Sequence, residues 1–172
     1  QRVAIARAFA ADPALVLLDE PLSALDVSVQ ASLINLLFEL QAQKRAAYLF
    51  ISHDLAAVHH LADAVAVMYL GRIVETGDAD DVFAPPYHPY TEALLSAIPV
   101  ADPTVSQENI RLAGSVPSAA AIPPGCPFHT RCPRQLGTLC RTQAPPWRGG
   151  KTHSRIHCHI PLEELTRLQA GT

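Results

Sequence analysis

Two short apolar runs, residues 14–19 and 46–52, flank a longer stretch whose apolar side chains recur with helical spacing. The stripe of that stretch consists of Val29, Leu33, Leu36, Leu37 and Leu40. Helices are predicted at about 1–11, 28–43 and 54–60, and strands at about 14–19, 46–52 and 64–70. Strands without polar alternation, separated by helices, indicate an α/β fold with a parallel sheet covered on both faces.

The size and charge of the chain limit its class. With 172 residues, 49% of them hydrophobic, we expect one domain with an appendage. A formal net charge of −3 gives no general attraction to nucleic acid or anionic membranes. No apolar run approaches the roughly 18 residues that span a bilayer, and no signal peptide opens the chain, so we expect a soluble protein linked to membranes through partners. Because Gln1 lies inside a helical pattern, we expect the C-terminal part of a longer protein.

The chain changes character after about residue 84. Only two of its 15 prolines precede residue 85, and after one more short helix near 91–98 no second sheet-and-helix core is expected. No Asp or Glu occurs from Asn109 to Leu162, where basic residues and all four cysteines lie. A loop-rich segment of this length is either disordered or held together by an added constraint.

Polar residues follow two of the predicted strands. Asp19 and Glu20 end the first apolar run, and His53 follows the second, in the sequence FISHD. In a parallel sheet with a right-handed crossover, these ends meet at one edge, where ligands bind. Two adjacent carboxylates repel each other unless a cation offsets them, and Mg²⁺ with a phosphate group is a common solution.

These motifs also carry a family resemblance. LVLLDEPLSALD (15–26) resembles the Walker B strand and D-loop of ABC-type ATPases, and YLFISHDL (48–55) resembles their switch-histidine loop. QRVAIARAFAADP (1–13) is similar to the helix that follows the ABC signature sequence. The resemblance covers residues 1–83 and implies the C-terminal portion of a nucleotide-binding domain. The phosphate loop, Q-loop and signature sequence are expected upstream of Gln1, so this chain alone is not expected to bind ATP well.

The resemblance implies a role for each site residue, with ATP and Mg²⁺ as cofactors. Asp19 is expected to hold Mg²⁺ through water, and Glu20 to orient the attacking water or accept its proton. His53 is expected to hydrogen-bond the γ-phosphate. Asp26 is expected to contact the second ATPase subunit of a head-to-tail dimer, and Ser23 is either structural or touches the partner's nucleotide.

The four cysteines, Cys126, Cys132, Cys140 and Cys158, have the spacing C-x5-C-x7-C-x17-C. This spacing is not that of paired zinc knuckles, and disulfides are disfavoured in a cytosolic protein. Four unrelated thiols remain an alternative. The basic surroundings favour thiolates, and an iron–sulfur cluster tolerates irregular spacing, with a Cys₄ zinc site as its alternative. The basic run could also bind nucleic acid, but few aromatic residues and no recognition helix accompany it.

The second half of the chain carries a narrower resemblance. GRIVETGDADDVFAPPYHPYTEALLSAIPVADP (71–103), then GCPFHTRCP (125–133), a third cysteine and a late HCH, look like the C-terminal region of oligopeptide/dipeptide importer ATPases. Residues 84–172 are accordingly expected to be the loop-rich, cysteine-containing extension of that family. The resemblance implies a [4Fe–4S] cluster on the four cysteines.

The same resemblance implies the setting of the protein. It implies an energy-coupling ATPase for peptide uptake at the cytoplasmic face of the plasma (inner) membrane. The partners are a second ATPase subunit, identical or different, two membrane permeases and an extracytoplasmic solute-binding protein, with no nucleic acid expected. Two alternatives remain, namely a non-transport ABC ATPase acting on nucleic acid or ribosomes, and an inactive fragment or metal-binding module.

Overall fold

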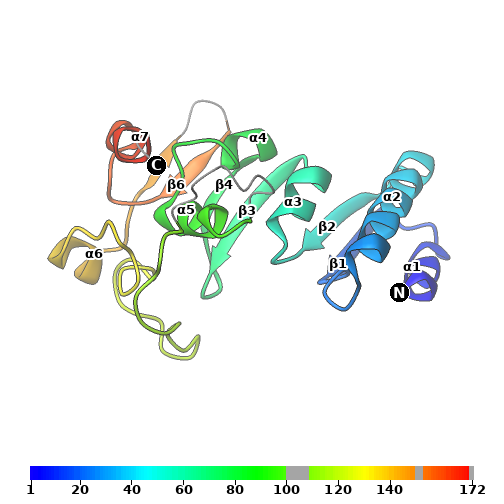
Figure 1. Cartoon of the computed structure of the whole chain (residues 1–172), viewed down its shortest axis with the longest axis horizontal. Coiled ribbons are helices and arrows are strands. Elements are labelled where there is room, and N and C mark those ends of the chain that lie inside the picture. Colours follow the sequence, from blue (N-terminus) through cyan, green and yellow to red (C-terminus); the bar gives the residue numbers. More distant parts are fainter. Residues whose placement is uncertain (100–108, 150–152, 171–172) are drawn as a thin grey trace. The chain divides into compact units, whose positions relative to one another are not determined.

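The computed structural model describes residues 1–99, 109–149 and 153–170. The chain forms two compact units, Gln1–Ala62 and Asp63–Thr172, which are called here the first and the second unit. Both contain helices and strands, as the prediction of an α/β protein requires (Figure 1). No helix among the described residues is both long enough and apolar enough to cross a membrane.

The first unit follows the predicted order of elements closely. Its elements are α1 (Arg2–Phe9), β1 (Leu15–Asp19), α2 (Val27–Lys44), β2 (Ala47–Ile51) and α3 (Leu55–Leu61). The two strands pair in parallel, with Leu15 opposite Ala47 and Asp19 opposite Ile51. Because the two strands run parallel, with α2 as the crossover between them, their carboxyl ends lie at the same edge of this two-stranded sheet.

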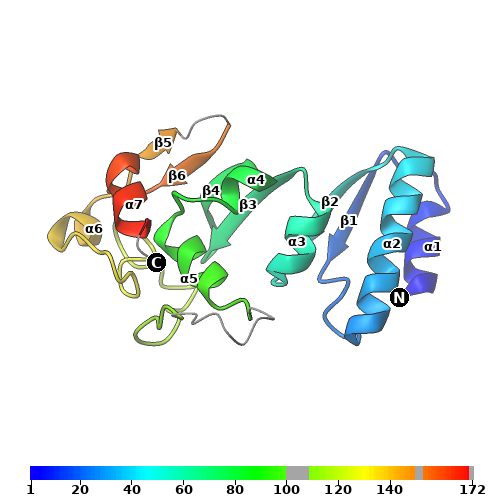
Figure 2. The ribbon, with the colours of Figure 1, turned by 45° about the horizontal axis from the view of Figure 1, so that its top comes forward.

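The core of the first unit lies on one face of this sheet. Val16 and Leu18 of β1 are buried there with residues of α1 and α2, namely Ile5, Phe9, Leu33 and Leu37. Figure 2 shows both helices on the same side of β1. On the other face, Leu15, Leu17, Leu49 and Ile51 are exposed. The prediction of a sheet covered on both faces is therefore wrong for this chain, since α1 and α2 cover the same face.

The second unit contains a four-stranded antiparallel sheet. Its elements are β3 (Ala64–Tyr69), β4 (Arg72–Asp78), α4 (Ala79–Val82), α5 (Pro89–Ser96), α6 (Thr138–Thr142), β5 (Trp147–Gly149), β6 (Arg155–His157) and α7 (Leu162–Gln169). The strand order is β3-β4-β6-β5, and every pair in it is antiparallel.

Two predictions are corrected by this sheet. The third predicted strand, β3, lies in a separate sheet from β1 and β2 and pairs antiparallel with β4 across a tight turn with positive φ at Leu70 and Gly71. The proline-rich tail was expected to be loop-rich, without a second sheet-and-helix core, yet it contributes β5 and β6, which extend the sheet from β4. These strands have three residues each, which is too short for an alternating pattern to be visible in the sequence.

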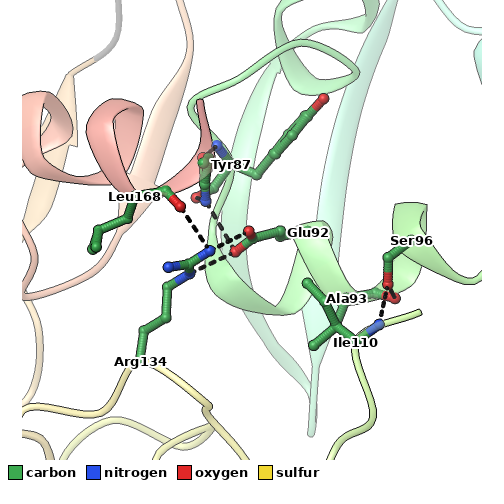
Figure 3. A network of polar contacts seen from close by, with 8 residues as sticks. Tyr87, Glu92, Ala93, Ser96, Ile110, Arg134 and Leu168 are labelled. Carbon is green, nitrogen blue, oxygen red and sulfur yellow. Dashed lines mark hydrogen bonds and ion pairs between the residues drawn. The ribbon is translucent and has the colours of Figure 1, made fainter. Parts of the chain in front are cut away.

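A network of polar contacts joins three segments of the second unit (Figure 3). Arg134 donates two hydrogen bonds to the Glu92 carboxylate of α5, at 2.9 and 2.6 Å, and a third at 3.2 Å to the carbonyl of Leu168 in α7. Gln169, also in α7, exchanges hydrogen bonds with the backbone of Tyr87 and donates to Glu92 at 3.1 Å. The proline-rich tail is thus attached to α5 through a partly buried ion pair and to α7 through a hydrogen bond.

Candidate functional site

The candidate site begins at the carboxyl edge of the parallel strands. Asp19 is the last residue of β1 and is exposed, on the same face of the strand as Leu15 and Leu17. The next residue, Glu20, extends the ladder, because its N–H donates to the carbonyl of Ile51 at 2.9 Å. The structure therefore brings both carboxylates to the edge where β2 ends, as predicted.

The backbone of Glu20 adopts an uncommon conformation. Its φ is +46°, in the left-handed region that side-chain-bearing residues rarely occupy. Ser23 contacts its carbonyl twice, through the N–H at 3.3 Å and the hydroxyl at 3.0 Å. Such strain persists only where the surroundings enforce it and is concentrated at functional sites. Ser23 therefore stabilises the turn that follows Glu20, and its contact with a partner's nucleotide stays a prediction.

Glu20 and His53 are in direct contact. His53 Nδ1 lies 2.9 Å from the Glu20 carboxylate, although 33 residues separate the two in the sequence. The hydrogen bond to Glu20, followed by its negative charge, raises the pKa of His53. The imidazole consequently stays protonated, and able to donate hydrogen bonds, to a higher pH than a free histidine.

Two aspartates fix the helices that leave this edge. Asp54 caps α3, because its Oδ1 accepts from the N–H groups of Ala56 and Ala57 at 3.0 and 3.1 Å. Asp26 caps α2 by accepting from the N–H of Val29 at 3.0 Å, and its side chain is exposed. Asp26 therefore has a structural task in the chain itself, which its predicted contact with a partner subunit does not exclude.

The four cysteines all lie in the second unit and are free thiols, with Cys126, Cys140 and Cys158 buried. The N–H of Cys126 donates to the carbonyl of Cys140 at 2.9 Å, and Cys140 Sγ accepts from the N–H of Leu136 at 3.3 Å. Within residues 1–99, 109–149 and 153–170, no group of three or more His, Cys, Asp or Glu side chains is arranged to hold a metal ion.

The ionisation of the thiols differs from the prediction. Basic surroundings were expected to favour thiolates, but burial raises the pKa of Cys132 to about 12 and that of Cys158 to about 11. Burial also raises the pKa of Cys126. Each of these three thiols further feels the charge of other cysteines, so they lie within electrostatic range of one another. Desolvation is the largest effect on each of these three thiols, and at Cys158 it outweighs the charge of Arg148, so Cys126, Cys132 and Cys158 are neutral at physiological pH.

Sequence reasoning missed a buried polar group on β4. Glu75 is 1% exposed and accepts hydrogen bonds from the N–H of His88, at 3.0 Å, and from the hydroxyl of Thr91. Burial raises the pKa of Glu75 to about 7, against the opposing effect of these two donors. Burial, together with His157, lowers the pKa of His88 to about 3. A single glutamate among strand residues carries no signal of such burial.

Comparisons with known proteins agree with the geometry of the first unit and the sequence of the second. Residues 74–140 match the family model described as "Oligopeptide/dipeptide transporter, C-terminal region". The chain is 51% identical over 160 residues to a probable peptide ABC transporter ATP-binding protein of Sinorhizobium fredii, covering 93% of this chain and 45% of that protein.

Two further relatives have similar names. The dipeptide transport ATP-binding protein DppF of Escherichia coli is 52% identical over 143 residues, which cover 83% of this chain and 43% of that protein. The oligopeptide transport ATP-binding protein AppF of Bacillus subtilis is 47% identical over 162 residues, covering 93% and 49%. The chain thus spans less than half the length of these curated relatives.

The strand edge with its carboxylates and histidine, together with these matches, points to one class: over most of its length the chain is similar to ABC transporter ATP-binding proteins. Within that class its sequence is similar to the oligopeptide/dipeptide transporter proteins, which confirms the resemblance seen in the sequence. The names of these relatives give no support to the alternative of an ABC ATPase that acts on nucleic acid or ribosomes.

Proposed function

We propose that this chain supplies the hydrolytic edge of the ATPase site in an ABC importer subunit for peptides. The observation that carries the proposal is the contact between Glu20 and His53 at the carboxyl edge of two parallel strands. We further propose that residues 1–83 are the C-terminal portion of the nucleotide-binding domain and that residues 84–172 are the family's C-terminal extension.

The donor set at this edge fits a magnesium–nucleotide complex, because carboxylate oxygens are the ligands Mg²⁺ prefers. Mg²⁺–ATP, when bound, supplies the phosphoryl group and the positive charge that offsets the carboxylates. Asp19 holds the ion's water shell, and Glu20 orients the attacking water and accepts its proton. His53, whose pKa the contact with Glu20 raises, donates a hydrogen bond to a phosphate oxygen in its protonated form. Ser23 fixes the turn, and Asp26 faces the second ATPase subunit.

The change Glu20→Gln in the complete protein tests this assignment. We expect ATP binding to persist and turnover to fall by about 10²–10⁴-fold, the usual contribution of a positioned general base. Glu39→Gln is the matched control, because Glu39 is exposed on α2, away from the strand edge. Wild-type turnover in the Glu20→Gln protein would remove Glu20 from the chemistry.

The relatives' names support the choice of cargo and partners. We propose that the complete protein works at the cytoplasmic face of the inner membrane with a second ATPase subunit, two permeases and an extracytoplasmic solute-binding protein. Reconstituted in vesicles with these partners, it is expected to drive ATP-dependent uptake of a labelled dipeptide or oligopeptide. Uptake that is independent of ATP, or confined to non-peptide solutes, contradicts this part of the proposal.

We also propose that Cys126, Cys132, Cys140 and Cys158 hold a metal centre, a [4Fe–4S] cluster with Zn²⁺ as the alternative. Four free thiols gathered in one unit, within electrostatic range of one another, support the proposal. Binding requires deprotonation and closer approach of the sulfur atoms, since burial keeps Cys126, Cys132 and Cys158 neutral and the described thiols are not arranged as ligands. Anaerobically purified protein should be brown and contain iron. A colourless sample with one zinc per chain identifies the alternative, and a metal-free sample rejects both.

A further inference from the structure

The turn between Glu20 and Asp26 is held by side chains that donate to its backbone carbonyls. The carbonyl of Glu20 accepts from the Ser23 hydroxyl within the turn. The carbonyl of Pro21 accepts from Gln1 Nε2 at 2.6 Å, and those of Leu22 and Leu25 accept from Gln30 Nε2 at 3.1 and 3.2 Å. Four of the six carbonyls of residues 20–25 therefore receive a side-chain donor, three of them from glutamines outside the turn.

Gln30 is placed to do this by the start of α2. Its own N–H donates to the carbonyl of Asp26 at 2.9 Å, so it lies one helical turn beyond the cap. From there its half-buried side chain reaches back over the turn, and one amide nitrogen bridges two carbonyls three residues apart. The side chain of Leu22, 2% exposed, anchors the same turn in the core.

We propose that Gln30 is a positioning residue for ATP hydrolysis, in that its amide fixes the turn whose two ends present Glu20 and Asp26. The inference rests on the proposed function, because it assigns Gln30 a task in that reaction. Glu20 leaves the strand with φ +46°, so its carboxylate is aimed by the path of the turn that follows. Since small displacements of a catalytic group carry large rate penalties, a looser turn slows the chemistry more than it weakens nucleotide binding.

The test uses the complete protein with its second ATPase subunit. Gln30→Met preserves the shape of the side chain and removes its donors, whereas Gln30→Lys restores donors at similar reach. Gln43→Met is the matched control, an exposed glutamine near the other end of α2. The measurements are kcat and KM for ATP, normalised to the active fraction by ATP-binding stoichiometry, with the melting temperature of each variant.

We expect Gln30→Met to lower kcat by about tenfold and to change KM by less than about twofold. Gln30→Lys is expected to recover most of the loss, and Gln43→Met to behave as the wild type. A normal kcat for Gln30→Met, or a loss explained fully by a smaller active fraction, overturns the inference alone. Absence of ATP turnover in the wild type overturns the proposed function and this inference with it.

Discussion

Replacing Glu75 with glutamine should remove one pH-dependent contribution to the stability of the second unit. Burial raises the pKa of Glu75 to about 7, from an ordinary value of 4.5. A carboxyl group with a raised pKa binds more protons in the folded than in the unfolded chain, so stability falls as the pH rises from 4.5 to 7. At about 1.4 kcal/mol for each pH unit, the contribution amounts to about 3 kcal/mol.

A second buried group works in the opposite direction. His88, whose pKa is lowered to about 3 from 6.5, binds fewer protons in the folded chain, so it adds stability as the pH rises through that range. His157, whose pKa burial also lowers, acts in the same sense. Between pH 4.5 and 6.5 these contributions offset that of Glu75. The wild-type curve alone therefore hides the effect, and the difference between variant and wild type reveals it.

The assay is urea unfolding at a series of pH values from 4.5 to 8, followed by fluorescence of the only tryptophan, Trp147 in β5. The free energy of unfolding of Glu75→Gln, relative to wild type, should increase by about 3 kcal/mol between pH 4.5 and 8. Glu164→Gln, an exposed glutamate of α7, is the control and should show little change. A difference between Glu75→Gln and wild type that does not vary with pH refutes the reasoning.

Two further changes test contacts within the second unit. Arg134→Met removes the cationic partner of the buried Glu92 carboxylate, so it should lower the free energy of unfolding by about 3 kcal/mol. The control, Arg141→Met, changes an exposed residue and should have little effect. Equal effects of the two changes in urea unfolding contradict this prediction. Gly125→Ala and Gly114→Ala share φ +71°, but only at Gly125 would the new Cβ lie 2.5 Å from a carbonyl oxygen. Gly125→Ala should therefore lower the free energy of unfolding by about 1–3 kcal/mol, and its melting temperature should be lower than that of Gly114→Ala. Equal melting temperatures of the two variants would argue against that close packing.

The first unit was predictable because its signals are local and repeated. Apolar runs and the stripe on α2 located the strands and helices to within a few residues, and parallel connection brought Glu20 and His53 to one edge. The roles of these residues in catalysis stay predictions. The bridging amide of Gln30 was not predictable, because a polar residue one turn inside a helix is ordinary in sequence.

The second unit was predictable only in part. The helix near Thr91 was expected from its helical spacing and is present. The strands of the tail were missed because three-residue strands have no detectable period. The partly buried ion pair of Glu92 with Arg134 was also missed, since charged residues are normally expected at the surface.

The pairing of β4 with β6 has a consequence for the order of folding. Glu75 lies opposite Ile156, so about 80 residues must be synthesised after β4 before its neighbour exists. Closing a loop of this length is a late and slow step compared with forming helices and hairpins. During synthesis, β3 and β4 can form a hairpin early, while the other edge of β4 stays unpaired until the residues of β6 have been synthesised. Truncation before Arg155 should therefore leave an aggregation-prone hairpin, rather than a smaller version of the folded unit.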